Sequence, residues 1–131
     1  MRTSHSLGEL QLAIMRVLWE EGEATVSRVH EALPADKSRA LTTIATMLTK
    51  MEKKGVVKHR TEGRQFVYLP TVSEDAVTRS MVADLTQRLF SGNVTELVSH
   101  LLQDQEIDGE ELGRLRALIA QRAAEEEGDG R

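Results

Sequence analysis

The feature that most constrains the fold is a helical pattern that leads directly into a hairpin pattern. In residues 41–54 (LTTIATMLTKMEKK), apolar residues recur at three- and four-residue intervals, which predicts a helix over about 39–54 that ends at Gly55. Residues 56–70 then hold two β-rich runs, 56–60 and 65–69, around the turn-forming pair Glu62-Gly63. These runs predict a β-hairpin closed by Pro70. The inward side of the helix is expected to consist of Leu41, Ile44, Leu48 and Met51.

Two further helical patterns precede this unit. The segment SLGE matches a capping box, which predicts a first helix that starts at Ser6 and ends at Glu21-Gly22. Trp19, near the end of this helix, is expected to pack in the core or between subdomains. Thr25 can cap a second, shorter helix that Pro34 stops. Three helices and a hairpin predict a winged helix-turn-helix domain over residues 1–71.

The remaining residues predict helices alone. Starts are expected at Ser73, at the NVTE segment 93–96 and at the DGEE segment 108–111. About 50 residues with one apolar stripe per helix are difficult to stabilise alone, which favours a helical dimerisation domain over 72–122. An intrachain core and an effector pocket are the alternative roles for the stripe, and residues 123–131 are expected to form a disordered acidic tail. The predicted dimer interface consists of Val77, Met81, Leu85, Leu89, Leu97, Val98, Leu101, Leu102, Leu112 and Leu115. The predicted fold class is therefore mainly α with a small β-hairpin wing.

The charge distribution is uneven, although the 131-residue chain has a net charge of only −4. Residues 1–70 hold 11 Lys and Arg against 8 Asp and Glu, whereas residues 71–131 hold 6 against 13. Residues 37–64 alone hold 8 cations against Glu52 and Glu62. A local basic patch of this kind favours binding to a polyanion.

The outward face of the helix over 39–54 is rich in threonine. A helical wheel places Thr42, Thr46 and Thr49 opposite the apolar side, with Lys residues further along. Small hydroxyl side chains can approach base edges in a DNA major groove, and the lysines that follow can reach phosphates. A solvated face is the alternative interpretation. The predicted DNA-binding residues are Arg39, Thr42, Thr43, Thr46, Lys50, Lys53, Lys58, Arg60 and Arg64.

Several classes of function are not expected. The sequence contains no cysteine, which excludes disulfides and thiolate metal sites. Its four histidines lack metal-ligand spacing, and no Walker loop, G-x-S-x-G or G-x-G-x-x-G motif is present. No apolar run is long enough to cross a membrane, and the N-terminus lacks the apolar region of a signal peptide. We therefore expect a cytoplasmic protein that is not an enzyme and has no catalytic residues, metal or cofactor.

Three segments resemble one family of repressors. These are LGELQLAIMRVLWEEGEATVSRVHEAL (7–33), ALTTIATMLTKMEKKGVV (40–57) and EGRQFVYLP (62–70). Together they are similar to the penicillinase-repressor (BlaI/MecI/CopY) family, over residues 7 to about 119. The resemblance implies a bacterial, homodimeric transcriptional repressor that binds an inverted repeat in promoters. It also implies that Thr43 and Thr46 read bases, while Arg39, Thr42, Lys50 and Arg64 lie near the DNA backbone.

The resemblance carries two further implications about regulation. Members that control β-lactam resistance are released when a membrane sensor protease triggers a cut at an Asn-Phe step, and the matching step here is His100-Leu101. Copper-responsive members carry a C-x-C-x4-C-x-C motif, which this cysteine-free chain lacks.

Two alternative functions remain open from the sequence. One is a winged-helix protein-interaction module, and the other is an effector-sensing regulator of the multidrug-resistance type.

Overall fold

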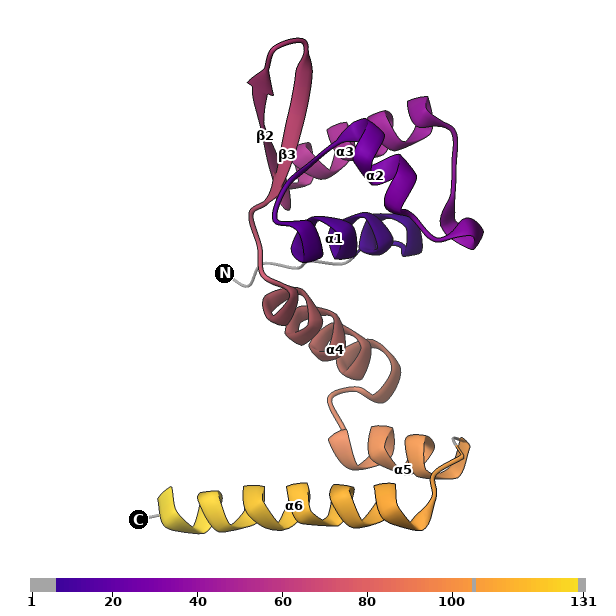
Figure 1. Ribbon diagram of the computed structural model, residues 1–131. Helices are drawn as coiled ribbons and strands as arrows, with labels where there is room; N and C mark the ends of the chain where they lie inside the picture. Colours follow the sequence, from indigo (N-terminus) through magenta and orange to yellow (C-terminus); the bar gives the residue numbers. More distant parts are fainter. Residues whose placement is uncertain (1–6, 105, 130–131) are drawn as a thin grey trace.

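The computed structural model describes residues 7–104 and 106–129, and its N-terminal half forms a winged helix (Figure 1). Three helices pack together beside a small antiparallel sheet whose strand order is β1-β3-β2. The helices are α1 (Glu9–Glu21), α2 (Val26–Ala32) and α3 (Leu41–Lys54), with a 3-10 turn, η1 (Ala35–Lys37), before α3. The strands are β1 (Ala24–Thr25), β2 (Val57–Glu62) and β3 (Gln65–Pro70). The predicted fold class is confirmed.

The helix ends agree with the sequence at most positions. The Thr25 hydroxyl accepts a hydrogen bond from the backbone N–H of Arg28 at 3.1 Å, and so caps α2 as predicted. Gly55 ends α3 with a φ of 89°, in the left-handed region that only glycine adopts easily. The predicted start of α1 at Ser6 is wrong, because Gly8 is the N-cap residue of this helix; Ser6 itself lies outside the described residues.

The wing is a hairpin with a two-residue loop. Glu62 pairs with Gln65, so the loop consists of Gly63 and Arg64, and Gly63 has a φ of 63°. A positive φ at the first loop position matches the type II′ turn, whose twist suits antiparallel strands. The short strand β1, which pairs Ala24 with Tyr68, has no periodic signal in the sequence and is missed by the prediction.

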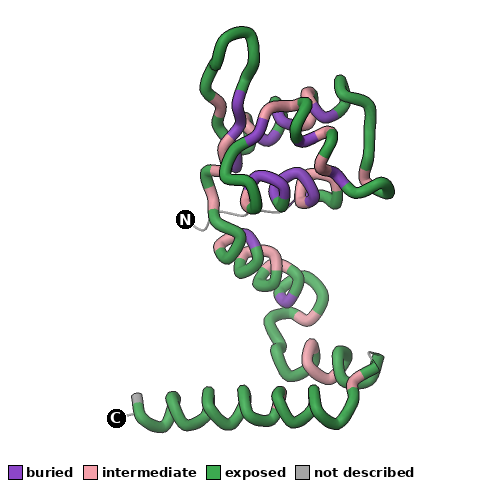
Figure 2. Tube along the Cα trace, in the orientation of Figure 1, coloured by how far each residue is buried: buried purple, intermediate pink, exposed green. Residues whose placement is uncertain are grey.

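The core of the winged helix is aliphatic. Ile14 and Leu18 of α1, Val29 of α2, and Ile44 and Leu48 of α3 have no exposed surface. Figure 2 shows that buried positions concentrate in this half of the chain. One predicted core residue is wrong: Leu41 is 45% exposed. It is the first residue of α3, which begins at Leu41 rather than at Arg39, so no preceding turn covers it.

The C-terminal half extends away from the winged helix as three successive helices (Figure 1). They are α4 (Glu74–Phe90), α5 (Val94–Asp104) and α6 (Gly109–Asp129). Their starts are capped as predicted, because the side chains of Ser73, Asn93 and Asp108 each accept a hydrogen bond from a backbone N–H three residues on. Within the described residues, no helix combines the length and the apolarity needed to cross a lipid bilayer.

The acidic segment after residue 122 differs from the sequence-based expectation. We expect disorder over 123–131, whereas the structure continues α6 to Asp129. Alanine and glutamate, which make up all of residues 123–127, have high helix propensity and prolong a helix that is already nucleated.

Candidate nucleic-acid interface

One face of the first half of α3 is exposed to solvent. Thr42, Thr43 and Thr46 are exposed, and within the described residues their hydroxyls form no hydrogen bond. The opposite side of the helix carries Ile44 and Leu48, which are fully buried. The fold therefore presents three unpartnered hydroxyl groups on the first half of a firmly packed helix.

Thr49 differs from the other threonines of α3. Its hydroxyl donates a hydrogen bond to the carbonyl oxygen of Ala45 at 3.1 Å, and its side chain also bonds to the Tyr68 hydroxyl. Burial raises the pKa of Tyr68, and the bond to Thr49 partly offsets this shift. Thr49 thus helps to join α3 to the wing, and its hydroxyl is engaged by the protein.

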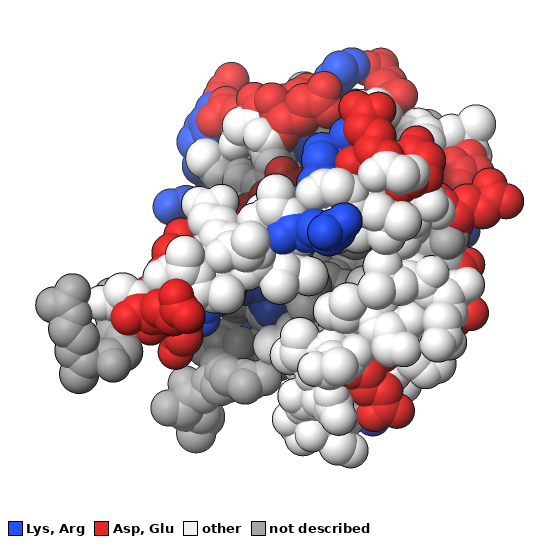
Figure 3. Space-filling model, turned by 90° about the horizontal axis from the view of Figure 1, so that it is seen from below, with Lys and Arg blue, Asp and Glu red and all other residues white. Residues whose placement is uncertain are grey.

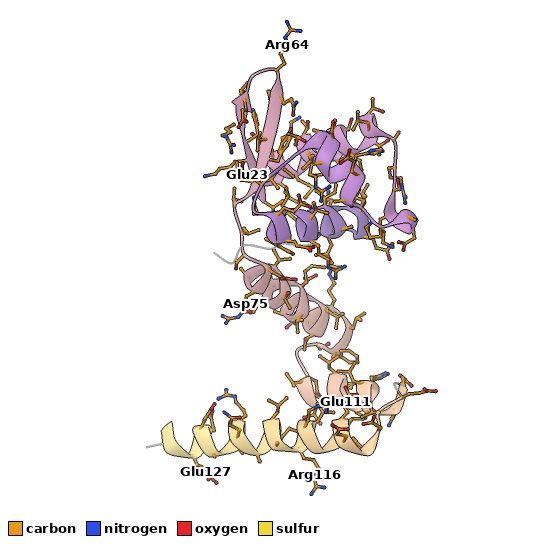
Figure 4. All side chains as sticks on the ribbon, in the orientation of Figure 1. Glu23, Arg64, Asp75, Glu111, Arg116 and Glu127 are labelled. Carbon is orange, nitrogen blue, oxygen red and sulfur yellow. The ribbon has the colours of Figure 1, made fainter. Side chains whose placement is uncertain are left out.

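The predicted cations fall into two groups. Lys50 and Lys53 continue the exposed face of α3, and Arg64 occupies the tip of the wing (Figure 4). Among the described residues, none of these three cations has a carboxylate within 4.0 Å. Arg39, just before α3, is exposed and donates a hydrogen bond to the Ser38 carbonyl oxygen at 2.8 Å. These four side chains and the threonines form what we call the α3 face.

Lys58 and Arg60 lie on the other side of the wing. Side chains alternate along β2, and His59 faces α3, so Lys58 and Arg60 point away from it. Arg60 is bound by two carboxylates: Glu23 accepts hydrogen bonds at 2.7 and 2.8 Å, and Glu62 accepts one at 2.8 Å. Arg60 is therefore charge-compensated in the free protein, unlike Lys50.

The Arg60 cluster also attaches the wing to the domain. Glu23, which Figure 4 labels, lies between α1 and β1. Its pairing with Arg60 therefore joins the wing to the segment before β1. The hydrogen bonds that Arg60 donates to Glu23, and secondly to Glu62, raise the pKa of Arg60, and the same bond to Glu23 lowers the pKa of that carboxylate. Because the carboxylate pKa is lowered in the folded state, the attachment is present above the ordinary carboxyl pKa and is lost as pH falls through the lowered value.

The inner side of the wing carries an aromatic cluster that sequence reasoning missed. The ring of Phe66 stacks on His59 with centroids 4.1 Å apart, and Tyr68 lies 5.6 Å from His59. His59 Nδ1 is 2.6 Å from a carboxylate oxygen of Glu52 on α3. Phe66 is nevertheless 47% exposed. His59 lies opposite Tyr68 in the hairpin register, and Phe66 lies two residues from Tyr68 on the same face of the sheet. This cross-strand arrangement is the signal that predicts the cluster.

An open groove separates α3 from the wing. It has a volume of about 470 Å³ and is lined by Thr49 and Ala45 of α3, by Arg64 and Phe66 of the wing, and by the residues around the start of α2. A ridge formed by α3 beside a cationic hairpin matches the arrangement of a recognition helix and a wing that follows the DNA backbone.

The C-terminal helices expose an apolar surface. Of the ten predicted interface residues, Leu85, Leu89, Leu101, Leu102 and Leu112 are between 41 and 68% exposed. Leu97, Val98 and Leu115 are partly buried. Val82, Val94, Leu118 and Ile119 are also more than half exposed, although the predicted interface does not include them. Figure 3, which views the molecule from below, shows uncharged surface interspersed with more Asp and Glu than Lys and Arg.

The structure corrects one residue of the predicted interface and partly covers a second. Val77 is only 1% exposed and belongs to the core of the winged helix, so it is not available to a second copy. Met81, one turn further along α4, is partly buried against the same core. The physical reason is that the first two turns of α4 pack on the N-terminal domain. An apolar stripe in the sequence shows that a helix face is covered, but it does not show which partner covers that face.

A three-helix domain with a protruding hairpin and an exposed hydroxyl-and-cation face on its third helix defines a winged-helix regulator of the DNA-binding class. The model of the penicillinase repressor family matches residues 7–121, and the chain belongs to this family. The resemblance predicted from the sequence is confirmed.

Relatives of this chain carry the names of regulators. It is 27% identical over 119 residues to the penicillinase repressor of Bacillus licheniformis, and the aligned region covers 91% of this chain and 93% of the relative. It is 32% identical over 117 residues to the transcriptional regulator BlaI of Mycobacterium tuberculosis, and the aligned region covers 88% of this chain and 83% of the relative. A solution structure of the DNA-binding domain of the repressor BlaI is 32% identical, with a TM-score of 0.49, and covers 56% of this chain and 90% of that domain.

Proposed function

We propose that two copies of this chain bind an inverted-repeat DNA operator and repress the adjacent promoter. The observation that carries this proposal is the α3 face, on which three threonine hydroxyls precede two lysines, all without a bonding partner among the residues that the structure describes. The hydroxyls of Thr43 and Thr46 can exchange hydrogen bonds with base edges, and their methyl groups can pack on thymine methyls, while the hydroxyl of Thr42 lies near the DNA backbone. Short side chains also allow the helix backbone to approach the floor of the major groove.

The cations have a different role in this proposal. Lys50 and Lys53 lie one to two turns beyond the threonines, where phosphates rather than bases are in reach, and Arg64 extends from the wing tip toward the flanking backbone. Arg39 lies at the start of α3, close to the same backbone. The acidic C-terminal half is repelled by DNA, which favours the orientation in which the α3 face meets the duplex.

The C-terminal helices would hold the two copies together. An apolar surface that is spread over α4, α5 and α6 and left exposed in a single chain is typical of an interface. A second copy provides the same surface, so a two-fold arrangement can bury both. Such a dimer presents two α3 helices to two half-sites about 34 Å apart, one turn of the double helix.

Release of the operator would follow damage to this dimer. The step that corresponds to the family's cleavage site, His100-Leu101, lies within α5, and both residues are exposed. A protease requires an extended substrate, so a cut at this step requires local unfolding of α5. In this proposal a membrane sensor protease is the partner that triggers the cut, and the repressor acts in the cytoplasm, where the DNA is.

Selection from a pool of random duplexes tests the proposal. We expect the protein to enrich an inverted repeat, and a gel shift with the selected duplex to report one dimer per site. Enrichment of a single half-site without symmetry would contradict the dimeric arrangement. Absence of any shift with genomic fragments at low salt would refute DNA binding and favour a protein-interaction module. Displacement of the protein from DNA by a small molecule would favour an effector-sensing regulator.

A further inference from the structure

The first part of α4 belongs structurally to the winged helix. The indole Nε1 of Trp19, on α1, donates a hydrogen bond to the backbone carbonyl oxygen of Val72 at 2.8 Å. Val77 is buried in the core of the winged helix, and Val72 and Met81 pack against it. Two types of contact, one polar and one apolar, therefore fasten the base of α4 to the winged helix. Figure 1 shows α4 directly below α1.

The other end of α4 has the opposite character. Leu85 and Leu89 are 42% and 68% exposed, and this end packs with α5 rather than with the winged helix. Phe90, the last residue of α4, has its ring 5.2 Å from His100 of α5. One continuous helix thus joins the domain that carries α3 to the helices that carry the exposed apolar surface.

We propose that Trp19 is a positioning residue that sets the distance between the two α3 helices of the dimer, and therefore the half-site spacing that the protein accepts. This inference depends on the proposed function, since it requires dimeric binding to two half-sites. Trp19 lies on α1, whereas the predicted DNA-binding residues lie at the start of α3, along α3 and on the wing. Trp19 acts through the angle at which α4 leaves the winged helix.

The geometry amplifies small changes in this angle. α4 has 17 residues, and at about 1.5 Å per residue it is roughly 25 Å long. A rotation of about 10° at its base displaces the far end by roughly 4 Å, which is close to the ~3.4 Å rise of one base pair. Discrimination between spacings that differ by one base pair consequently requires an angle that is fixed within a few degrees.

The hydrogen bond is the part of the junction that can supply this precision. Burial of Val77 and Met81 is stabilising in many orientations, because the hydrophobic effect has no direction. A hydrogen bond from a ring N–H to a carbonyl oxygen loses strength steeply when it bends. The Trp19–Val72 bond also acts on the two-residue segment between β3 and the Ser73 cap, which is the only chain connection between the wing and α4.

The test uses Trp19→Phe, which keeps an aromatic ring at the junction and removes the N–H donor. The probes are duplexes with two copies of the selected half-site, whose separation changes in steps of one base pair, and a duplex with one half-site. We expect wild-type protein to prefer one spacing. For Trp19→Phe we expect the preference over the neighbouring spacings to fall by roughly threefold to tenfold, the equilibrium effect of one neutral hydrogen bond. Affinity for the single half-site should not change.

Two controls separate this role from a general structural one. Thr78→Ala changes an exposed residue of the same helix next to Val77 and should leave the spacing profile as in wild type. Val77→Ala keeps the Trp19 bond but loosens the apolar contact, and should reduce the thermal stability more than the spacing preference. An unchanged profile in Trp19→Phe, or an equal loss on the single half-site, overturns the inference. If the wild-type protein binds no half-site at all, both the proposed function and this inference are refuted.

Discussion

Substitution of Lys50 by Ala provides the sharpest measure of how this protein meets DNA. Lys50 is exposed on the α3 face and, among the described residues, has no carboxylate within 4.0 Å. Its charge is therefore available to a phosphate without the loss of an existing ion pair. Arg60 offers a matched contrast, because Glu23 and Glu62 already bind its guanidinium group. Both residues are cations that the sequence assigns to DNA binding.

The magnitude follows from counterion release. Each phosphate that a cation neutralises contributes about 0.9 to the slope of log affinity against log salt concentration. A dimer loses two such contacts when Lys50 becomes Ala, so the slope should become shallower by about 1.8. Between about 50 and 200 mM salt, this difference changes the ratio of wild-type to variant affinity by roughly tenfold.

The assay is fluorescence anisotropy on the selected operator and on an unrelated duplex at several salt concentrations. Lys50→Ala should weaken binding to both duplexes alike, because a phosphate contact carries no sequence information. Arg60→Ala should change the slope by less than about half as much, since its charge is compensated before DNA arrives. Equal changes of slope in the two variants, or a loss confined to the operator, would refute this division of the cations.

Three further tests address base readout, the core and the dimer interface, and the first two each include a control substitution. In competition binding, Thr46→Ala should reduce the preference for the operator over unrelated DNA by about 1–3 kcal/mol. Thr49→Ala should leave that preference unchanged, because the Thr49 hydroxyl is already bound by the protein. Leu48→Ala should lower the free energy of unfolding by about 2–5 kcal/mol in a urea titration, and Leu41→Ala, at a 45% exposed position, by far less. Leu118→Glu places a charge on the exposed apolar surface of α6 and should shift the protein from dimer to monomer in analytical ultracentrifugation. The helical circular dichroism signal should not change. A dimer that persists would show that α6 is not part of the interface.

Local patterns in the sequence predict most of the winged helix. The caps at Thr25, Ser73, Asn93 and Asp108 and the left-handed Gly55 follow from short-range chemistry, which is why they are found where predicted. The helical periodicity likewise identifies Ile44 and Leu48 as buried.

The errors occur where a distant partner decides the outcome. An apolar stripe shows that a helix face is buried but not what buries it, so Val77 is assigned to a dimer interface although the winged helix covers it. Leu41 fits the apolar side of the wheel, yet it begins the helix and lacks a neighbour. The ion pair of Arg60 with Glu23 joins residues that are 37 positions apart in the chain, so no local pattern predicts it.

The threonines of α3 show how folding and binding are separated on one helix. Each threonine costs up to about 0.7 kcal/mol of helix stability relative to alanine, so four of them cost at most about 3 kcal/mol. On the opposite side, full burial of Ile44, Leu48 and Met51 contributes about 1.5–3 kcal/mol per side chain, which exceeds that cost. The packed side alone can therefore hold α3 in place. The exposed side is free to carry the short hydroxyl side chains that approach to a base pair requires, even though those residues weaken the helix that presents them.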